Sequence, residues 1–233
     1  MSEHVTIITT PFMFNVAVNC YLVRAEDGFV LIDTGRASKR RDIEQALARA
    51  GCQSGNLKLI VLTHGDFDHC GNAAYLRQKF GARLAMHEAD AGMIERGDMA
   101  WNRPVGGLSR LFFSVFMRLA RADRVAPDCF LAEGDDLIGH GLDARVIELP
   151  GHSSGSIGLL TGAGDLFCGD LLANTDRPAL WSIIVDDAAA QASVAKLKSL
   201  PPTTTVYPGH GGPFLLADFL ADLPASQEAS PAA

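Results

Sequence analysis

The segment THGDFDH, residues 63–69, directly follows the apolar run 57–62, which has the length and composition of a buried strand. It contains four potential metal ligands within six residues: His64, Asp66, Asp68 and His69. Burial of so many imidazoles and carboxylates is unfavourable unless a cation compensates them. Alternate side chains of a curled loop can converge on one point, so the segment predicts a metal site at the end of this strand.

Three shorter motifs repeat this arrangement further along the chain. They are LPGH at 149–152, FCGD at 167–170 and YPGH at 207–210, and they end on His152, Asp170 and His210. We expect each motif to begin in a strand and to place its ligand in the following loop. Glycine precedes each ligand, so the backbone can approach closely or adopt a positive φ. Open α/β architectures gather ligands at such loops, so we expect the four segments to form one site.

The pattern of apolar runs, turns and helical periodicity predicts a layered α/β protein. In the first half we expect strands at 5–9, 19–24, 29–33, 57–62 and 83–86, with helices at 38–50 and 72–80. In the second half we expect strands at 128–131, 143–149, 156–161, 165–168 and 203–207, with a helix at 188–200. Hairpins that alternate with crossover helices imply two packed mixed sheets with helices outside them.

Length and composition favour one globular domain. The 233 residues are 48% hydrophobic and 20% charged, which is ordinary for a globular protein. We expect a single domain over 1–223 with a helical insertion at about 92–127, and a disordered tail at 224–233. The net charge of −7 disfavours binding to phosphate backbones. We therefore expect a small-molecule substrate and no nucleic acid.

The predicted insertion is both apolar and basic. Between residues 96 and 124 it holds six arginines and two aspartates, and Leu108 and Leu111 share one face of its predicted helix. The simplest interpretation is a helix that packs on the core or on a second copy of the chain in a homodimer. A lid, a surface anchor or a clamp for acidic substrates are alternatives. In the last case Arg110 and Arg118 would suit an acyl chain that carries a negative group.

Cysteine usage and the N-terminus predict a cytoplasmic protein. The five cysteines are odd in number and lack CxxC spacing, so we expect reduced thiols. The first residues, MSEHVTIITTPF, lack the basic start and apolar run of a secretory signal. The sequence has no apolar stretch of the roughly 18 residues that a membrane-spanning helix needs, and we predict no transmembrane segment.

These motifs, in this order, resemble those of the metallo-β-lactamase superfamily. The resemblance rests on Asp33 in LIDTG (31–35), the HxHxDH-type loop at 64–69, and the later Gly-His, Gly-Asp and Gly-His motifs. It covers roughly residues 5–215, which is nearly the whole chain. It implies an αββα four-layer sandwich of two mixed β-sheets, with a one- or two-metal site at the sheet edges.

The resemblance also assigns expected roles to individual residues. It places His64 and His152 at a first metal site, Asp68, His69 and His210 at a second site, Asp170 as the bridging carboxylate, and Asp33 as a supporting residue that orients the ligands. The family implies two divalent metal ions, usually zinc.

Asp66 departs from the family pattern, because it stands where the family usually has a second histidine. A carboxylate there can still bind metal, and its hardness favours iron or manganese relative to zinc. With Asp66 as a ligand, two divalent ions and a bridging hydroxide would balance the charge of three carboxylates. In the alternative, Asp66 does not bind metal, and only the second site holds its ion firmly.

The predicted chemistry is hydrolysis by a metal-activated water, with Asp68 as the catalytic residue that accepts the proton or orients the nucleophile. We expect the substrate to be a small ester, lactone or thioester. A glyoxalase-type thioesterase is disfavoured, because that type usually carries a C-terminal helical domain and only about 23 residues follow His210. An iron-dependent redox enzyme, such as an oxygenase of a sulfur compound, and a non-catalytic metal-binding protein are the alternatives.

The segment GHSSG at 151–155 also fits the GxSxG pattern of serine hydrolases, in which Ser153 would be the nucleophile. A true nucleophile elbow lies between a strand and a helix. Here the residues that follow predict a strand, so we expect Ser153 or Ser154 to bond to nearby loop backbone instead.

Overall fold

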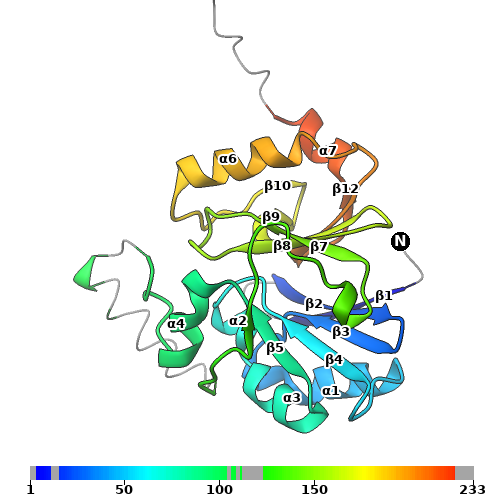
Figure 1. The fold of residues 1–233 in the computed structure, drawn as a ribbon. Helices are drawn as coiled ribbons and strands as arrows, with labels where there is room; N and C mark the ends of the chain where they lie inside the picture. The colour runs from blue at the N-terminus through cyan, green and yellow to red at the C-terminus, as the bar shows by residue number, and fades with distance from the viewer. Residues whose placement is uncertain (1–3, 12–15, 104–105, 109–110, 112–122, 224–233) are drawn as a thin grey trace, which may run out of the picture.

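The computed structural model describes residues 4–11, 16–103, 106–108, 111 and 123–223. In this part of the chain two six-stranded sheets face each other, and helices cover both outer faces (Figure 1). The predicted αββα arrangement of two mixed sheets is confirmed.

The N-terminal sheet has its strands in chain order, β1-β2-β3-β4-β5-β6. Its first three strands pair antiparallel and the later ones pair parallel. The strands are β1 (Val5–Pro11), β2 (Ala17–Ala25), β3 (Gly28–Ile32), β4 (Leu57–Val61), β5 (Arg83–Met86) and β6 (Cys129–Phe130). The helical segments of this half are η1 (Ala37–Lys39), α1 (Arg40–Arg49), α2 (Phe67–Cys70), α3 (Ala73–Phe80) and α4 (Glu88–Arg96).

The C-terminal sheet has the order β12-β11-β9-β8-β7, and β10 also pairs with β9. Among the strand pairs described in this sheet, only β9–β11 is parallel. The strands are β7 (Ala144–Glu148), β8 (Ile157–Thr161), β9 (Asp165–Asn174), β10 (Ala179–Leu180), β11 (Thr205–Gly211) and β12 (Phe214–Leu215). The helical segments are η2 (Ile138–His140), α6 (Asp187–Leu197) and α7 (Leu216–Ala221), and α6 and α7 lie over the outer face of this sheet (Figure 1).

Three apolar clusters separate the four layers. Alternate side chains of a strand point to opposite faces of its sheet. In β3, accordingly, Phe29 and Leu31 pack toward α1 and α3, whereas Val30 and Ile32 pack between the two sheets. The third cluster lies between the C-terminal sheet and the helices α6 and α7. The continuous apolar runs of the sequence therefore correspond to strands that are buried on both faces.

The two sheets are also tied together by hydrogen bonds between β2 and β11. Asn19 donates its side-chain amide to the carbonyl oxygens of Pro208 and Gly211, at 3.1 and 2.7 Å. The hydroxyl of Tyr21 donates to the same Pro208 oxygen at 2.5 Å. These bonds hold the final strand of one sheet against an early strand of the other.

Two strands extend further than the sequence predicts. The predicted strand 165–168 continues as β9 to Asn174, and the predicted strand 203–207 continues as β11 to Gly211. The prediction that Asp170 and His210 lie in loops is therefore wrong, because both lie within strands. The pairing of β9 with β11 changes register between Tyr207 and His210, and this irregularity made the strand end hard to see in the sequence.

Much of the predicted insertion, including Arg110 and Arg118, lies outside the described residues, as does the whole predicted tail. Leu108 and Leu111 are described and exposed. The single-domain organisation, the disorder of the tail and a homodimer through the insertion stay predictions.

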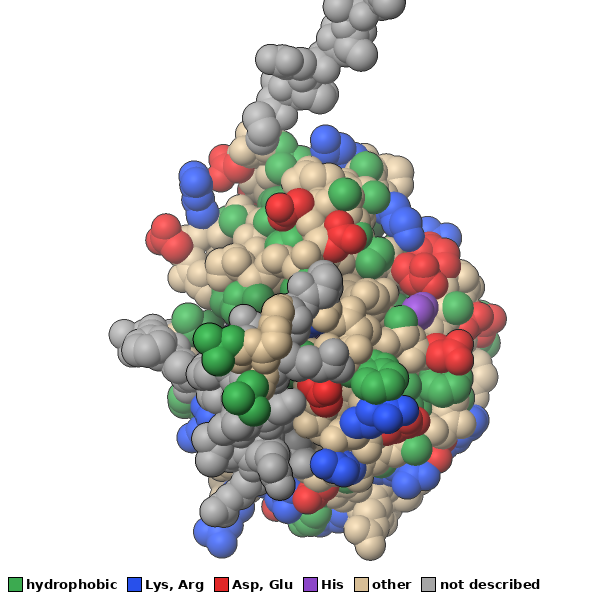
Figure 2. Space-filling model, turned by 90° about the vertical axis from the view of Figure 1, so that its left-hand side faces the viewer, with side chains coloured by type: hydrophobic (Ala, Val, Ile, Leu, Met, Phe, Trp, Pro, Cys, Tyr) green, Lys and Arg blue, Asp and Glu red, His purple; other side chains and the backbone are tan. Residues whose placement is uncertain are grey.

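Acidic and basic side chains are interspersed on the described part of the face shown in Figure 2.

Two further observations concern the cysteines and the membrane prediction. All five cysteines are free thiols, and four of them are buried. Among the helices that the structure describes, none has both the length and the apolar composition needed to cross a bilayer.

Candidate metal centre

The fold brings together all seven predicted ligand residues. His64 and Asp66 lie in the loop after β4, Asp68 and His69 in α2, His152 in the loop after β7, Asp170 in β9, and His210 in β11. The seven residues are buried, with at most 6% exposure of the whole residue. Their ligand atoms form three overlapping groups, each with mutual distances within 4.8 Å: His64–Asp66–His152, His64–His69–Asp170, and Asp68–His69–His210.

The four histidines share one hydrogen-bonding pattern. Each ring contacts a protein oxygen through Nδ1: Thr63 Oγ1 for His64 (2.9 Å), Asp33 Oδ2 for His69 (2.8 Å), the Ile183 carbonyl for His152 (2.6 Å) and the Ala17 carbonyl for His210 (2.8 Å). Carbonyl and carboxylate oxygens only accept hydrogen bonds, so this network assigns the proton to Nδ1. Nε2 is then the atom that each ring presents to the centre of the cluster, as in metal-binding histidines.

Asp33 supports two of these histidines at once. Its Oδ2 accepts hydrogen bonds from His69 Nδ1 and from the hydroxyl of Thr63, both at 2.8 Å. That hydroxyl is in turn free to accept from His64 Nδ1, while Asp33 Oδ1 accepts from the backbone N–H of Thr63. Asp33 also has a φ of 59°, the one positive value among the described non-glycine residues. This conformation turns the chain after β3 so that the carboxylate contacts Thr63 and His69.

The cluster contains buried polar atoms that fit a missing cation. His64 Nε2, His69 Nε2 and Asp170 Oδ1 have no hydrogen-bond partner among the described residues. Orphaned polar atoms of this kind are costly in a protein interior. Imidazole nitrogens and carboxylate oxygens are the donors that zinc, iron and manganese accept. The residues present therefore fit a divalent metal ion.

The electrostatics of the metal-free cluster are those of a cation site. Burial raises the pKa of Asp68, and the nearby carboxylates of Asp170 and Asp66 add to this effect although His69 opposes it. Burial lowers the pKa of His69, but Asp170, Asp33 and Asp68 outweigh it and raise that pKa to about 10. Asp68 thus resists ionisation and His69 holds a proton, which indicates an excess of negative charge around these two residues. Although burial raises the pKa of Asp66 and of Asp170, both pKa values are lowered overall, by Arg103 and His152 at Asp66 and by His210 and His69 at Asp170.

Glycine at 209 permits the closest approach in the site. A Cβ atom on Gly209 would lie 2.0 Å from Asp170 Oδ1 and 2.8 Å from His69 Cε1. A side chain at this position would therefore displace the bridging carboxylate predicted from the sequence. The next residue, His210, is covered on one side by the indole of Trp181, whose ring stacks on it with centroids 4.5 Å apart.

Sequence reasoning missed Arg103, which is 7% exposed and lies inside the cluster. Its Nη1 and Nη2 atoms lie 2.8 and 3.0 Å from the two carboxylate oxygens of Asp66. Nη2 also lies 3.2 Å from Nε2 of His152. One signal could have found it: a carboxylate replaces the family histidine at position 66, and a buried carboxylate requires a cation.

Asp90, at the start of α4, is a second residue that the sequence did not single out. It is fully buried. Its Oδ2 accepts from Gly65 N at 3.1 Å and from Ser153 Oγ at 2.6 Å, and its Oδ1 accepts from Gly155 N at 2.8 Å and from Asn102 Nδ2 at 2.5 Å. One carboxylate thus joins the ligand loop after β4, the His152 loop and the turn that precedes Arg103.

These contacts agree with the interpretation of GHSSG as a loop. The hydroxyl of Ser153 is bonded to Asp90 and lies 2.7 Å from the hydroxyl of Ser156, and the strand β8 follows instead of a helix. Ser153 therefore lacks the surroundings of a hydrolase nucleophile.

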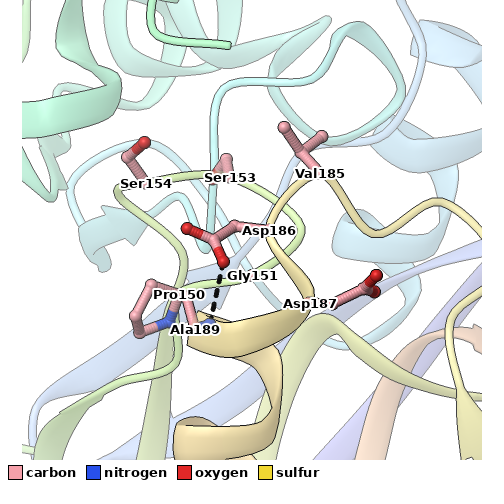
Figure 3. A pocket seen from close by; sticks show the side chains of 8 residues that line it. All are labelled: Pro150, Gly151, Ser153, Ser154, Val185, Asp186, Asp187 and Ala189. Carbon is pink, nitrogen blue, oxygen red and sulfur yellow. Dashed lines mark hydrogen bonds between the residues drawn. The ribbon is translucent and has the colours of Figure 1, made fainter. Parts of the chain in front are cut away.

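A pocket of about 380 Å³ lies beside the His152 loop (Figure 3). It is lined by Pro150, Gly151, Ser153 and Ser154, and from the α6 side by Val185, Asp186, Asp187 and Ala189. The seven predicted ligands are not among its lining residues. Asp186 is also the N-cap of α6, because its side chain accepts a hydrogen bond from Ala189 N at 3.0 Å (Figure 3). The carboxylates of Asp186 and Asp187 make this pocket unsuited to an anionic group.

Comparison with known proteins identifies the family. Residues 14–210 match the metallo-beta-lactamase superfamily, so the chain belongs to it. The solved structure of TTHA1623 in a di-iron-bound form superposes with a TM-score of 0.72 and is 30% identical, with 94% of this chain and 98% of that chain covered. The resemblance inferred from the motifs is thus confirmed.

Among curated relatives, the hydroxyacylglutathione hydrolase of Aeromonas hydrophila is 29% identical over 191 residues, which cover 82% of this chain and 59% of that protein. The hydroxyacylglutathione hydrolase GloC of Haemophilus influenzae is 30% identical over 158 residues, which cover 66% of each protein. The chain therefore spans about three fifths to two thirds of the length of these relatives.

Proposed function

We propose that this protein is a metal-dependent hydrolase that cleaves a small thioester, with esters and lactones as related substrates. The observation that carries the proposal is the convergence of four histidines, each with Nδ1 against a protein oxygen, on three buried carboxylates. The names of the curated relatives support the choice of a thioester, because hydroxyacylglutathione is one.

We assign His69, His210, Asp68 and Asp170 to one divalent ion, and His64, His152 and Asp66 to the other ligand set of the family. A bound divalent ion would supply Lewis acidity, which lowers the pKa of bound water and polarises a carbonyl group. Zinc, manganese and iron(II) all suit these donors, and the carboxylate of Asp66 favours manganese and iron(II) relative to zinc.

Asp68 is the residue to which we assign proton transfer. Its Oδ2 lies 3.6 Å from His210 Nε2 and 3.9 Å from His69 Nε2, so it lies at the edge of the second ligand set. In hydrolysis the water oxygen bonds to the carbonyl carbon, the C–S bond breaks with its electron pair on sulfur, and the proton from water neutralises the thiolate. Asp68 would accept that proton and release it to the leaving group.

The experiment compares metal-loaded protein with chelated protein on a panel of substrates, and follows thiol release. The panel contains S-lactoylglutathione, an acyl thioester without glutathione, an alkyl ester and a lactone. We expect thioester cleavage that disappears on chelation, returns with zinc or manganese, and is lost in His69→Ala. His140→Ala changes a histidine outside the cluster and should retain activity. Metal-loaded protein that cleaves none of the panel would contradict the proposal.

Iron-dependent redox chemistry is the second candidate. Two observations favour it: the carboxylate of Asp66 in place of a histidine, and the di-iron form of the structural relative TTHA1623. Iron-loaded protein that consumes oxygen in the presence of a sulfur compound, and cleaves no thioester, would favour this candidate over hydrolysis.

A further inference from the structure

We infer that the guanidinium of Arg103 takes the place of a metal ion in the first ligand set, so that the protein holds one divalent ion firmly instead of two. This inference rests on the proposed metal centre and concerns how many of its sites fill. The two ligand sets differ in the spacing of their ligand atoms.

In the second set the nitrogen–oxygen distances are those of neighbouring ligand atoms of an ion, with the two histidines facing different oxygens of Asp170. His69 Nε2 lies 3.4 Å from Asp170 Oδ1, and His210 Nε2 lies 3.3 Å from Asp170 Oδ2. A tetrahedral ion with bonds of about 2.1 Å separates neighbouring ligand atoms by about 3.4 Å. The second set is therefore already open to the right extent.

In the first set one pair of ligands has closed. Asp66 Oδ2 lies 2.9 Å from His152 Nε2, which is closer than two ligand atoms of one tetrahedral ion would lie, whereas His64 Nε2 remains 3.9 Å from the same oxygen. Arg103 Nη2 lies within 3.2 Å of both closed atoms. The guanidinium therefore faces the carboxylate oxygen and the imidazole nitrogen that an ion would otherwise bind.

Arg103 also occupies both oxygens of Asp66. Nη2 donates a hydrogen bond to Oδ2 at 3.0 Å, and Nη1 lies 2.8 Å from Oδ1, so the guanidinium forms a close ion pair with the whole carboxylate. The pair is buried on both sides, at 3% and 8% side-chain exposure. Separating a buried ion pair of this kind is strongly unfavourable, so a metal ion would have to displace the cation that already neutralises Asp66.

The charge of the cluster is balanced by this arrangement. The three carboxylates are Asp66, Asp68 and Asp170. One divalent ion together with the guanidinium supplies three positive charges, which match them. A second divalent ion beside Arg103 would leave an excess of positive charge in a buried site.

The position of Arg103 is fixed by the surrounding fold. Asn102 donates to Asp90 Oδ1 and to the Ala89 carbonyl at 2.7 Å, and its own carbonyl accepts from Ser154 Oγ at 3.3 Å. Trp101 packs so closely on α4 that a Cβ on Gly92 would lie 2.2 Å from its Nε1. Trp101 and Asn102, the two residues before Arg103, are thus held by contacts with α4 and with the His152 loop.

The test measures metal content, which is independent of turnover. Protein is chelated, supplied with a small excess of zinc, freed of unbound metal by gel filtration, and analysed by mass spectrometry. We expect one zinc per chain for the wild type and for Arg103→Lys, and two for Arg103→Met, with the second equivalent bound at least about tenfold more tightly than by the wild type. Arg145→Met makes the same change at an exposed position and should bind one.

Two results would overturn the inference: two firmly bound zinc ions in the wild type, or one in Arg103→Met. Absence of zinc from every variant would instead contradict the proposed metal centre itself. Because Arg103→Met leaves Asp66 unpaired, we include the double variant Asp66→His with Arg103→Met, which should bind two ions. Electron paramagnetic resonance of the manganese-loaded wild type needs no variant: isolated ions support the inference, and spin-coupled pairs overturn it.

Discussion

Asp33 Oδ2 lies 2.8 Å from His69 Nδ1, and so a carboxylate at the end of β3 fixes the ring of a histidine in α2. Such partners set the tautomer and orientation of a metal ligand, and their loss typically lowers metal affinity about 10- to 100-fold. We expect Asp33→Asn to lower zinc affinity within this range, as measured by competition with a chromogenic chelator. Asp27→Asn, an exposed aspartate in the β2–β3 turn, should leave the affinity unchanged. Equal affinity in Asp33→Asn and the wild type would contradict this role.

Asp90 accepts four hydrogen bonds in the interior. In Asp90→Asn an amide N–H₂ would face N–H and O–H donors, which leaves buried groups unpaired at a cost of about 2–4 kcal/mol. We expect the midpoint of urea unfolding to fall accordingly. Glu88→Gln, at an exposed position in the same turn of α4, is the matched control. A midpoint equal to that of the control would show that Asp90 does not join the three loops.

Gly151 holds the His152 loop against α6. Its φ is +142°, and an added Cβ would lie 2.6 Å from the Cβ of Ala190. Its carbonyl also accepts from Val185 N and Asp186 N, beside the pocket of Figure 3. We expect Gly151→Ala to lower the free energy of unfolding by about 2 kcal/mol or more, through backbone strain and overpacking. Gly139→Ala adds a methyl group in open space and should cost much less; similar losses in both variants would refute the argument.

The pKa of His69, raised to about 10, predicts a pH dependence of the metal-free protein. The ordinary value in an unfolded chain is about 6.5. A raised folded-state pKa contributes stability that is fully present below about pH 6.5 and is lost as the pH rises to about 10. Urea unfolding of chelated protein should therefore show stability falling across this window, and less so in His69→Gln. Stability that rises between pH 7 and 10 would contradict the sign.

The residues of the candidate site could be predicted from the sequence because each lies in a motif that begins in a recognisable strand. His64, Asp66, Asp68 and His69 are adjacent in the chain, so local pattern alone places them together. His152, Asp170 and His210 carry a glycine before them, which marks a close approach of the backbone. The order of the motifs then identified the family and, through it, the four-layer fold.

Contacts between distant segments could not be predicted in this way. Arg103 and Asp66 are 37 residues apart, and the pattern around Arg103 suggests only a basic insertion. Asp90 looks like an ordinary acidic residue at the start of a helix, since its four partners come from three different segments. The extension of β9 and β11 through Asp170 and His210 depends on pairing between strands, which a single sequence does not reveal.

The most direct test of the metal centre is anomalous diffraction from crystals grown with manganese or zinc. We predict an anomalous peak bonded to Nε2 of His69 and of His210 and to the carboxylates of Asp68 and Asp170. Crystals that contain the ion in solution but show no peak among these four side chains would contradict the account.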